Sequence, residues 1–341
     1  MVFKQVLEQV LTGNDLSHAD MLATMQQVVS GELTPAQIAG LVIALRVKGE
    51  SVDEIAAAAT VMRQLSTKVE ISDNKYLIDT CGTGGDGIQT FNVSTISAFV
   101  AAAAGAKVAK HGGRSVSSTC GSADVLEALG VNVNLTPEQV AKCVDEIGIG
   151  FMFAPNHHSA MKHAAPVRRE LGVRTIFNLL GPLTNPASAK RQVMGVFSQN
   201  LTLKLAKVLQ NLGSEHVLVV HGADGMDEIS FTGDTFVAEL KDGKVSEYTL
   251  NPAQFGLPLH ALKSIRVENA QQSKAMILDL LQGKSSVGKN SAARDIVLLN
   301  AGAAIYTAGL QANIHAGIVH AAKVIDSGEA LAKLNALKAI V

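Results

Sequence analysis

The chain has 341 residues, of which 47% are hydrophobic and 17% charged, and its formal net charge at pH 7 is −1. At roughly 100–200 residues per domain, this length predicts about two domains with a sizeable core. The apolar fraction excludes a disordered chain, and the balanced charge argues against a protein dedicated to binding nucleic acid. Few aromatic residues and 30 glycines favour an α/β enzyme, because small residues permit close packing and tight turns.

Residues 1–67 predict a small helical domain. Four consecutive helical segments are separated by glycine-containing turns, and no strand pattern lies between them. After the first, each helix opens with a hydroxyl residue that can cap it, followed by an acidic or amide residue three positions later. These opening pairs are Ser17 with Asp20, Thr34 with Gln37 and Ser51 with Glu54.

Residues 68–341 predict a larger α/β domain with a mostly parallel central sheet flanked by helices. Short apolar runs alternate with helical patterns, and an Asp-Gly turn at 242–243 lies within a predicted antiparallel hairpin. From about residue 270 the pattern is mostly helical, while the segment 155–186 fits either domain. The predicted strands are 76–79, 107–110, 149–154, 192–197 and 217–221, and the hairpin covers 231–250.

The cysteines and the N-terminus predict a cytoplasmic protein. Three cysteines without a CxxC pair argue against a disulfide framework and favour a reducing compartment. Lys4 and Glu8 interrupt the apolar N-terminus, which therefore differs from a secretory signal. The apolar run 96–104 is too short to span a bilayer.

A glycine-rich loop, Gly82-Thr-Gly-Gly85-Asp86-Gly87, follows the first predicted strand. Clustered glycines let backbone N–H groups converge on an anion. The hydroxyls of Ser94 and Thr95 follow at the start of the next predicted helix, where anions are favoured. The spacing is neither that of a P-loop nor GxGxxG. The pattern predicts a diphosphate or sugar-phosphate site, and a tight turn without a ligand is the alternative.

A second polar loop follows the next predicted strand. It runs Lys110-His-Gly-Gly-Arg114-Ser-Val-Ser-Ser118, with two permanent cations beside several hydroxyls, a composition that suits phosphate. Because the preceding strand is predicted to be parallel to the first, both loops are expected at one edge of the sheet. A solvated basic loop is the alternative.

Asp227 and Glu228 are adjacent carboxylates after the predicted strand 217–221. Hard oxygen ligands of this kind suit Mg²⁺, although an isolated acidic pair is more often a solvated turn. Cys81 and Cys120 lie beside the loops without an evident base and are interpreted as small turn-filling residues rather than nucleophiles.

Three histidines invite a zinc interpretation. The sequence argues against it, because no cysteine or carboxylate completes a ligand set and the spacing is not HExxH. The histidines are His157, His158 and His163.

Five motifs, found in order over nearly the whole chain, together resemble the anthranilate phosphoribosyltransferase family. They are Gly82-Thr-Gly-Gly-Asp86, Asn92-Val-Ser-Thr95, Lys110-His-Gly-x-Arg-Ser115, Phe177-Asn-Leu-Leu-Gly-Pro-Leu-Thr-Asn-Pro186 and Asp227-Glu228. The resemblance implies phosphoribosyl pyrophosphate and anthranilate as substrates, Mg²⁺ as cofactor with two ions per subunit, and a homodimer.

The resemblance also implies residue roles. Ser94, Asp227 and Glu228 match positions that coordinate magnesium. The residues implied to contact anthranilate, with the arginine on its carboxylate, are Gly82, Gly113, His111, His158, Arg168 and Pro182. Those implied to hold the pyrophosphate and ribose are Gly82, Gly85, Asp86, Thr90, Asn92, Val93, Ser94, Thr95, Lys110, His111, Gly112, Gly113, Arg114, Ser115, Val116, Ser117, Ser118 and Ser122.

The implied reaction displaces pyrophosphate from C1 of the ribose by the amine of anthranilate. An aromatic amine is neutral at pH 7, so no covalent protein nucleophile is expected, and none is evident in the sequence. Two features depart from the family pattern: Gly113 stands where asparagine is usual, and Thr119-Cys120 replaces Lys-Ser. We expect Gly113 to leave the binding of phosphoribosyl pyrophosphate intact and to weaken or rearrange that of anthranilate, and we expect Thr119-Cys120 to alter the floor of the phosphate site.

Two other functions are compatible with parts of the sequence. A pyrimidine-nucleoside phosphorylase shares the stretch from Lys110 to Asp124, but the glycine loop and the Asp227-Glu228 pair argue against it. A non-catalytic relative that binds nucleic acid would need a basic surface stripe and usually has degraded phosphate loops. Here the loops are intact and the charge is balanced.

Overall fold

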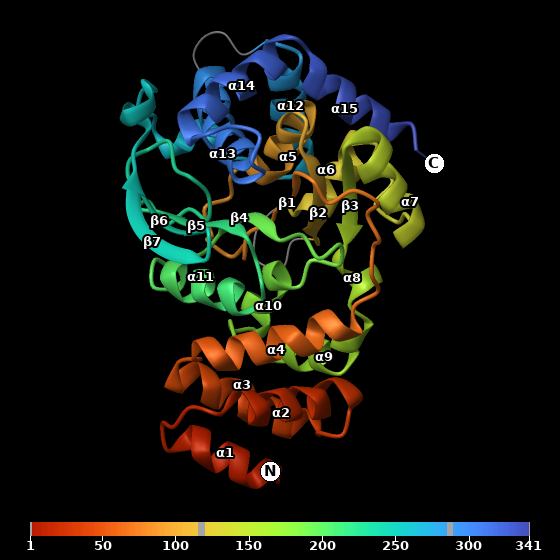
Figure 1. Cartoon of the computed structure of the whole chain (residues 1–341), viewed down its shortest axis with the longest axis vertical. Coiled ribbons are helices and arrows are strands. Elements are labelled where there is room, and N and C mark those ends of the chain that lie inside the picture. The colour runs from red at the N-terminus through yellow and green to blue at the C-terminus, as the bar shows by residue number, and fades with distance from the viewer. Residues whose placement is uncertain (1, 115–119, 285–288, 341) are drawn as a thin grey trace.

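The computed structural model describes residues 2–114, 120–284 and 289–340. It contains a helical lobe at the N-terminus and a larger α/β lobe, which confirms the expected fold class (Figure 1). The positions predicted from the sequence at Ser115, Val116, Ser117, Ser118 and Thr119 lie outside the described residues.

Capping side chains begin the helices of the first lobe largely as predicted. Thr34 Oγ1 accepts a hydrogen bond from Gln37 N (3.3 Å), and Gln37 Oε1 accepts one from Thr34 N (2.9 Å). Ser17 also caps its helix, but its hydroxyl donates to the Asp20 carboxylate, so Asp20 does not close the expected box on backbone. The helices are α1 (Phe3–Leu11), α2 (His18–Ser30), α3 (Pro35–Lys48) and α4 (Val52–Leu65).

The α/β lobe is built on a seven-stranded sheet in the order β3-β2-β1-β4-β5-β6-β7. The first five strands in this order are mutually parallel, and β6 and β7 are antiparallel, joined at Asp242 and Gly243, which both have positive φ as a tight hairpin requires. The strands are β1 (Leu77–Thr80), β2 (Lys107–Gly112), β3 (Ile149–Phe153), β4 (Arg191–Gly195), β5 (His216–Gly222), β6 (Thr235–Lys241) and β7 (Lys244–Leu250).

Helices cover both faces of the sheet. Alternate residues of the strands enter two hydrophobic clusters: Ile78 and Leu218 face α5 and α13, whereas Val217 and Val219 face α11 and the helical lobe. The remaining α-helices are α5 (Val93–Ala103), α6 (Ser122–Leu129), α7 (Pro137–Lys142), α8 (Ala154–His157), α9 (Ala164–Leu171), α10 (Phe177–Leu183), α11 (Leu201–Asn211), α12 (Ala270–Leu281), α13 (Lys289–Thr307), α14 (Ile314–Asp326) and α15 (Glu329–Lys338).

The segment 155–186 lies between the lobes. Its helix α9 contacts α3 and its helix α10 contacts α4 and β2 (Figure 1). Ala164, Phe177 and Leu180 belong to the same buried cluster as the cores of α1 to α4. No helix within the described ranges is both long and apolar enough to cross a membrane.

Candidate functional site at the carboxyl edge of the sheet

The glycine loop occupies the point where the order of the sheet reverses. The chain runs outward from β1 to β2 and β3, and then returns to place β4 on the other side of β1. Loops at the carboxyl ends of β1 and β4 therefore diverge at this point, which is where open α/β sheets bind ligands. Gly84, Gly85 and Gly87 have φ values of 63°, 80° and 77°, a conformation in which side chains are disfavoured.

The acidic pair reaches this loop from the end of β5. Asp227 Oδ2 accepts a hydrogen bond from Gly84 N at 2.8 Å, and Glu228 Oε1 accepts one from Ser94 N at 3.1 Å. The turn that presents the pair is held by Asp224, whose carboxylate accepts hydrogen bonds from Ser230 Oγ (2.8 Å) and Met226 N (3.1 Å). The structure therefore brings together the glycine loop, the first turn of α5 and the acidic pair.

A glycine that the sequence did not single out makes this approach possible. Gly195 ends β4, and its carbonyl oxygen accepts a hydrogen bond from Thr83 N (2.8 Å). A Cβ atom at Gly195 would lie 1.5 Å from the carbonyl oxygen of Asp227, so no other residue fits there. A Cβ atom at Gly82 would lie 2.8 Å from Asp227 Oδ2.

The carboxylates of the acidic pair are crowded. Burial among protein atoms and the negative charge of Asp86 raise the pKa of Asp227. Burial and the charge of Asp227 raise the pKa of Glu228, while Lys110 acts in the opposite direction. A divalent cation would relieve this repulsion, and two carboxylates with the Ser94 hydroxyl are hard oxygen donors that suit Mg²⁺. Among the described residues no His, Cys, Asp and Glu side chains form a ready-made group of three metal ligands, so other oxygens would have to complete the shell.

The second loop starts at the same edge. Lys110, at 2% exposed, points its ammonium group across β1, where it donates to the Thr80 carbonyl oxygen and to Ser94 Oγ (3.4 Å). Thr95 Oγ1 donates to Ser122 Oγ (3.3 Å), which joins the first turns of the helices that follow the two loops. The two loops are therefore adjacent, as predicted from the parallel strands.

Arg114 is paired within the protein. Its guanidinium group makes two hydrogen bonds to the Glu127 carboxylate (2.6 and 2.7 Å) and one to Asp124 Oδ1 (3.1 Å). These carboxylates raise the pKa of Arg114. The side chain therefore lies along α6, and it would have to exchange partners to meet a phosphate.

Two histidines and an arginine define a region beside the second loop. His158 Nε2 and His111 Nε2 lie 3.1 Å apart, and the buried Nδ1 of each ring has no hydrogen-bond partner within the described part of the chain. Burial lowers the pKa of both rings, and that of His158 falls to about 4. The half-buried Arg168 on α9 has no acceptor for its guanidinium group among the described residues, and burial lowers its pKa. Pro182 is buried in α10, where its carbonyl oxygen accepts from Gln192 Nε2 (2.8 Å).

His157 and His163, the other two of the three histidines considered as zinc ligands, have packing roles. His157 Nδ1 lies 3.0 Å from the Thr67 carbonyl oxygen and ties the start of the inter-lobe segment to the end of the helical lobe. The ring of His163 packs on Gly31, where a Cβ atom would lie 2.7 Å from it. The three histidines therefore have separate surroundings.

The cysteines beside the loops are protected thiols. Cys81 and Cys120 are buried and free, and burial raises the pKa of both, that of Cys120 to about 11. A thiol with a raised pKa is a poor nucleophile at neutral pH, in agreement with their interpretation as small residues in turns.

Asn185 belongs to the motif 177–186, in which the family resemblance implies a role only for Pro182. Its side chain supports the site. Asn185 Nδ2 donates to Asp79 Oδ2 (2.7 Å) and to the Ala109 carbonyl oxygen (2.9 Å), and Asp79 Oδ1 accepts from His111 N (3.1 Å). Burial raises the pKa of Asp79 to about 6. This buried network fixes the ends of β1 and β2 relative to each other.

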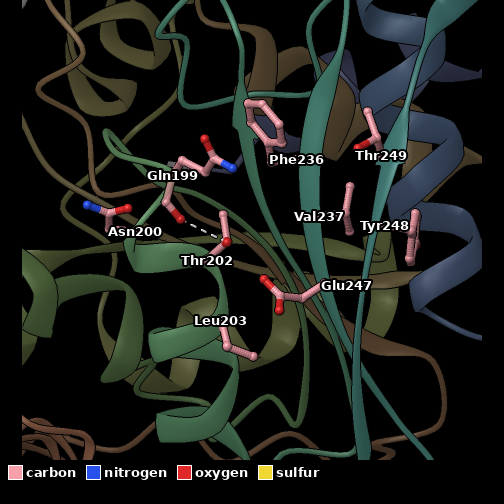
Figure 2. A pocket seen from close by; sticks show the side chains of 9 residues that line it. All are labelled: Gln199, Asn200, Thr202, Leu203, Phe236, Val237, Glu247, Tyr248 and Thr249. Carbon is pink, nitrogen blue, oxygen red and sulfur yellow. Dashed lines mark hydrogen bonds between the residues drawn. The ribbon is translucent and has the colours of Figure 1, made fainter.

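A cavity of about 550 Å³ lies elsewhere, between the start of α11 and the outer strands β6 and β7 (Figure 2). Thr202 Oγ1 there donates to the Gln199 carbonyl oxygen (2.9 Å) and so belongs to the first turn of α11. None of the unpartnered buried polar atoms found among the described residues lines this cavity. The chemistry-bearing residues are therefore those at the carboxyl edge of the sheet.

Comparison with known protein families matches both lobes. Residues 4–66 match the helical bundle domain of a glycosyl transferase family, and residues 74–331 match the a/b domain of that family. The chain therefore contains both domains of this glycosyl transferase family.

Comparison with individual proteins identifies the family within this class of glycosyl transferases. The anthranilate phosphoribosyltransferase of Methylobacillus flagellatus is 65% identical over 340 residues, covering 100% of this chain and 98% of the relative. The crystal structure of anthranilate phosphoribosyltransferase from Thermus thermophilus is 42% identical, with a TM-score of 0.91 and 98% of both chains covered. The Saccharomyces cerevisiae enzyme in complex with PRPP and Mg is 30% identical, with a TM-score of 0.87 and 98% and 96% covered. The chain belongs to the anthranilate phosphoribosyltransferase family.

Proposed function

We propose that the chain transfers the phosphoribosyl group of phosphoribosyl pyrophosphate to the amine of anthranilate, giving N-(5-phosphoribosyl)anthranilate and pyrophosphate. The observation that carries the proposal is the meeting of the glycine loop, the Lys110 loop and the Asp227–Glu228 pair at one sheet edge. Full-length identity of 65% to an anthranilate phosphoribosyltransferase supports it.

The activated sugar would lie across the two loops. Backbone N–H groups of Gly82, Gly85 and Asp86 and the start of α5 would face the bound diphosphate, and the dipole of α5 favours negative charge there. Lys110 supplies a buried positive charge beside Ser94. Thr90, Asn92 to Thr95, Gly112 to Ser118 and Ser122 would complete the site.

Magnesium would be held by Ser94, Asp227 and Glu228, with two ions per subunit. When bound, the metal neutralises charge on the pyrophosphate leaving group. Few protein ligands suit this role, because Mg²⁺ commonly keeps waters and takes substrate phosphate oxygens. The yeast relative with PRPP and Mg supports the metal.

Anthranilate would occupy the region of His111, His158, Arg168 and Pro182, near Gly82 and Gly113. Arg168 has no acceptor among the described residues, and a guanidinium group is the natural partner of a carboxylate. Both imidazoles are neutral at pH 7, because their pKa values are lowered, so they do not compete with Arg168 for the anion.

The main barrier of the reaction is cleavage of the C1–O bond, with positive charge developing on the ribose. Lys110 and the loop N–H groups stabilise the negative charge that leaves with pyrophosphate. The amine is already a neutral nucleophile, so the chain contributes mainly by positioning the two substrates in line. No covalent intermediate on the protein is needed.

The test follows the loss of anthranilate fluorescence on addition of phosphoribosyl pyrophosphate and Mg²⁺. The natural chain should turn over, Asp227→Ala should lose most activity, and Arg168→Ala should raise the KM for anthranilate. Arg169→Ala is the matched control, because Arg169 is an exposed neighbour on the same helix. Normal turnover by both Asp227→Ala and Arg168→Ala would overturn the site assignment even if the natural chain were active.

We further propose that the protein is a cytoplasmic homodimer and does not bind nucleic acid. We also propose that residues 1–67 form the helical domain and that part of 155–186 belongs to it. The contacts of α9 with α3 support the last point, and the three free cysteines suit a reducing compartment. Light scattering tests the dimer, and salt-sensitive retention on single-stranded DNA would contradict the exclusion of nucleic acid.

A further inference from the structure

Ser273, a buried serine outside both loops, forms hydrogen bonds with Asn92, the residue that links the ends of the two loops. It lies in the first turn of α12 and is 0% exposed. Its hydroxyl donates to Asn92 Oδ1 (2.7 Å) and accepts a hydrogen bond from Asn92 N (3.1 Å). The single proton of the hydroxyl is thereby committed to the Asn92 side chain.

The Asn92 amide in turn joins the ends of the two loops. Asn92 Nδ2 donates to the Cys120 carbonyl oxygen (3.1 Å), and Cys120 Sγ donates to Asn92 Oδ1 (3.2 Å). The orientation of the amide is therefore defined, because Oδ1 faces two donors and Nδ2 faces an acceptor. Asn92 ends the glycine loop, and Cys120 lies just before Gly121 and α6, at the end of the second loop.

The backbone before α12 supports the same loop end. Phe91 N donates to the Ile265 carbonyl oxygen (3.1 Å), and Val267 N donates to the Gln89 carbonyl oxygen (2.9 Å). The glycine loop is thus fastened to the segment 265–273 by backbone bonds, and Ser273 is the side chain of that segment that reaches the Asn92 amide. Removing the hydroxyl would leave these backbone bonds intact.

We propose that Ser273 is a positioning residue, which acts through Asn92 to hold the two loops at the spacing that phosphoribosyl pyrophosphate requires. This inference rests on the proposed function. Without the hydroxyl, Asn92 N loses its acceptor and Oδ1 loses its shorter bond, so only the contacts with Cys120 still hold the amide, and the spacing between the two loop ends is less firmly fixed. Ser273 lies outside the substrate region. We therefore expect its removal to raise the KM for phosphoribosyl pyrophosphate and to leave kcat nearly unchanged.

The first experiment compares Ser273→Ala with Ser97→Ala in the full-length protein. Ser97 is a matched control, because it is a buried helical serine whose Oγ has no hydrogen-bond partner in residues 2–114, 120–284 and 289–340. We expect Ser273→Ala to raise the KM for phosphoribosyl pyrophosphate about fivefold to tenfold, the range for one or two lost hydrogen bonds, with kcat changed less than about twofold. The KM for anthranilate and all constants of Ser97→Ala should stay unchanged.

A double-mutant cycle separates positioning from general packing. In an Asn92→Ala background, Ser273→Ala should change the KM for phosphoribosyl pyrophosphate by less than about twofold, because its target is gone. An unchanged KM in the single variant, or an equal effect in both backgrounds, would overturn the proposal. If Ser273→Ala does not fold, Ser273→Cys decides in the same assay, since its slightly larger thiol fills the site but is a weaker donor and acceptor in both bonds. A natural chain without turnover would instead refute the proposed function.

Discussion

Two adjacent glycines of the second loop differ in the space around them. A Cβ atom at Gly112 would lie 3.2 Å from Phe151 Cε2 and from Ser122 Cβ, whereas a Cβ atom at Gly113 would meet no atom of the described residues within 4 Å. A side chain at Gly112 would therefore be crowded, whereas the described residues around Gly113 leave room for a larger side chain. Gly113 follows His111 by two positions, and both residues are proposed to contact anthranilate.

Gly113→Asn should therefore fold normally and strengthen anthranilate binding. An amide at this position could bond the substrate, so we expect the KM for anthranilate to fall about threefold to tenfold, which one hydrogen bond can supply. The KM for phosphoribosyl pyrophosphate should not change. Steady-state kinetics with each substrate varied will measure this, with Gly112→Ala as the crowded comparison. An unchanged KM for anthranilate would show that the glycine is neutral.

Gly195 illustrates the opposite case, in which a missing side chain permits a close backbone contact. Gly195→Ala would place a methyl group 1.5 Å from the Asp227 carbonyl oxygen, so either β4 or the acidic turn must move. We expect activity to fall at least about a hundredfold, because a displacement of about 1 Å at a reacting site has effects of that size. Gly233→Ala, where a Cβ atom would meet no described residue within 4 Å, is the control. Full activity of Gly195→Ala would contradict the role given to Asp227.

At the scale of elements, the end of β2 and the turn after α8 meet through His111 and His158. The pKa of His158 is lowered from its ordinary value of 6.5 to about 4, mainly by burial. Between these two values the unfolded chain binds a proton that the folded chain does not bind. The folded state is therefore progressively destabilised as the pH falls from 6.5 to 4, and this contribution is absent above pH 6.5.

His158→Asn should reduce this acid sensitivity. Between pH 7.5 and pH 5.0 the natural chain should lose about 1–2 kcal/mol more of its free energy of unfolding than the variant, as expected for a pKa lowered by this amount and partly screened by solvent. Urea denaturation at the two pH values measures the difference. His315→Asn, which leaves the His111–His158 contact intact, should behave as the natural chain does. Equal losses for the natural chain and His158→Asn would contradict the interpretation.

At the scale of the whole molecule, one hydrophobic cluster runs through both lobes. It includes Val10 of α1, Leu41 of α3, Leu180 of α10 and Leu240 of β6. The helical lobe thus completes the core on one face of the sheet instead of enclosing a separate core. Two lobes that share a core are expected to unfold together.

Leu41→Ala should destabilise both lobes equally, although Leu41 lies in the helical one. The three tyrosines, Tyr76, Tyr248 and Tyr306, all lie in residues 68–341, so their fluorescence follows the α/β lobe, whereas far-ultraviolet circular dichroism follows all helices. The free energy of unfolding should fall by about 2–5 kcal/mol when it is measured by either signal, because this is the usual cost of truncating a buried leucine. Val47→Ala, at an 82% exposed site, should shift neither by more than about 0.5 kcal/mol. A separate early transition seen only by circular dichroism would refute the shared core.

Much of the architecture is predictable because the signals are local. The helix that opens at Thr34, the hairpin at Asp242-Gly243 and the two polar loops each depend on residues within a few positions of one another. Capping, positive φ and alternation act over one or two turns of chain, so they are readable without a structure. They determine the elements, and they place the loops after parallel strands.

Only the tertiary structure shows which distant groups meet. Sheet order places β4 between β1 and β5, and this brings Asp227 to Gly84, 143 residues away, and makes Gly195 indispensable. Ser273 lies 181 residues from Asn92, and no local pattern distinguishes it from other helical serines. Strand register and helix packing depend on the fit of whole surfaces, so the sequence by itself determined the kind of chemistry at each loop, whereas the fold decided the positions and partners of those groups.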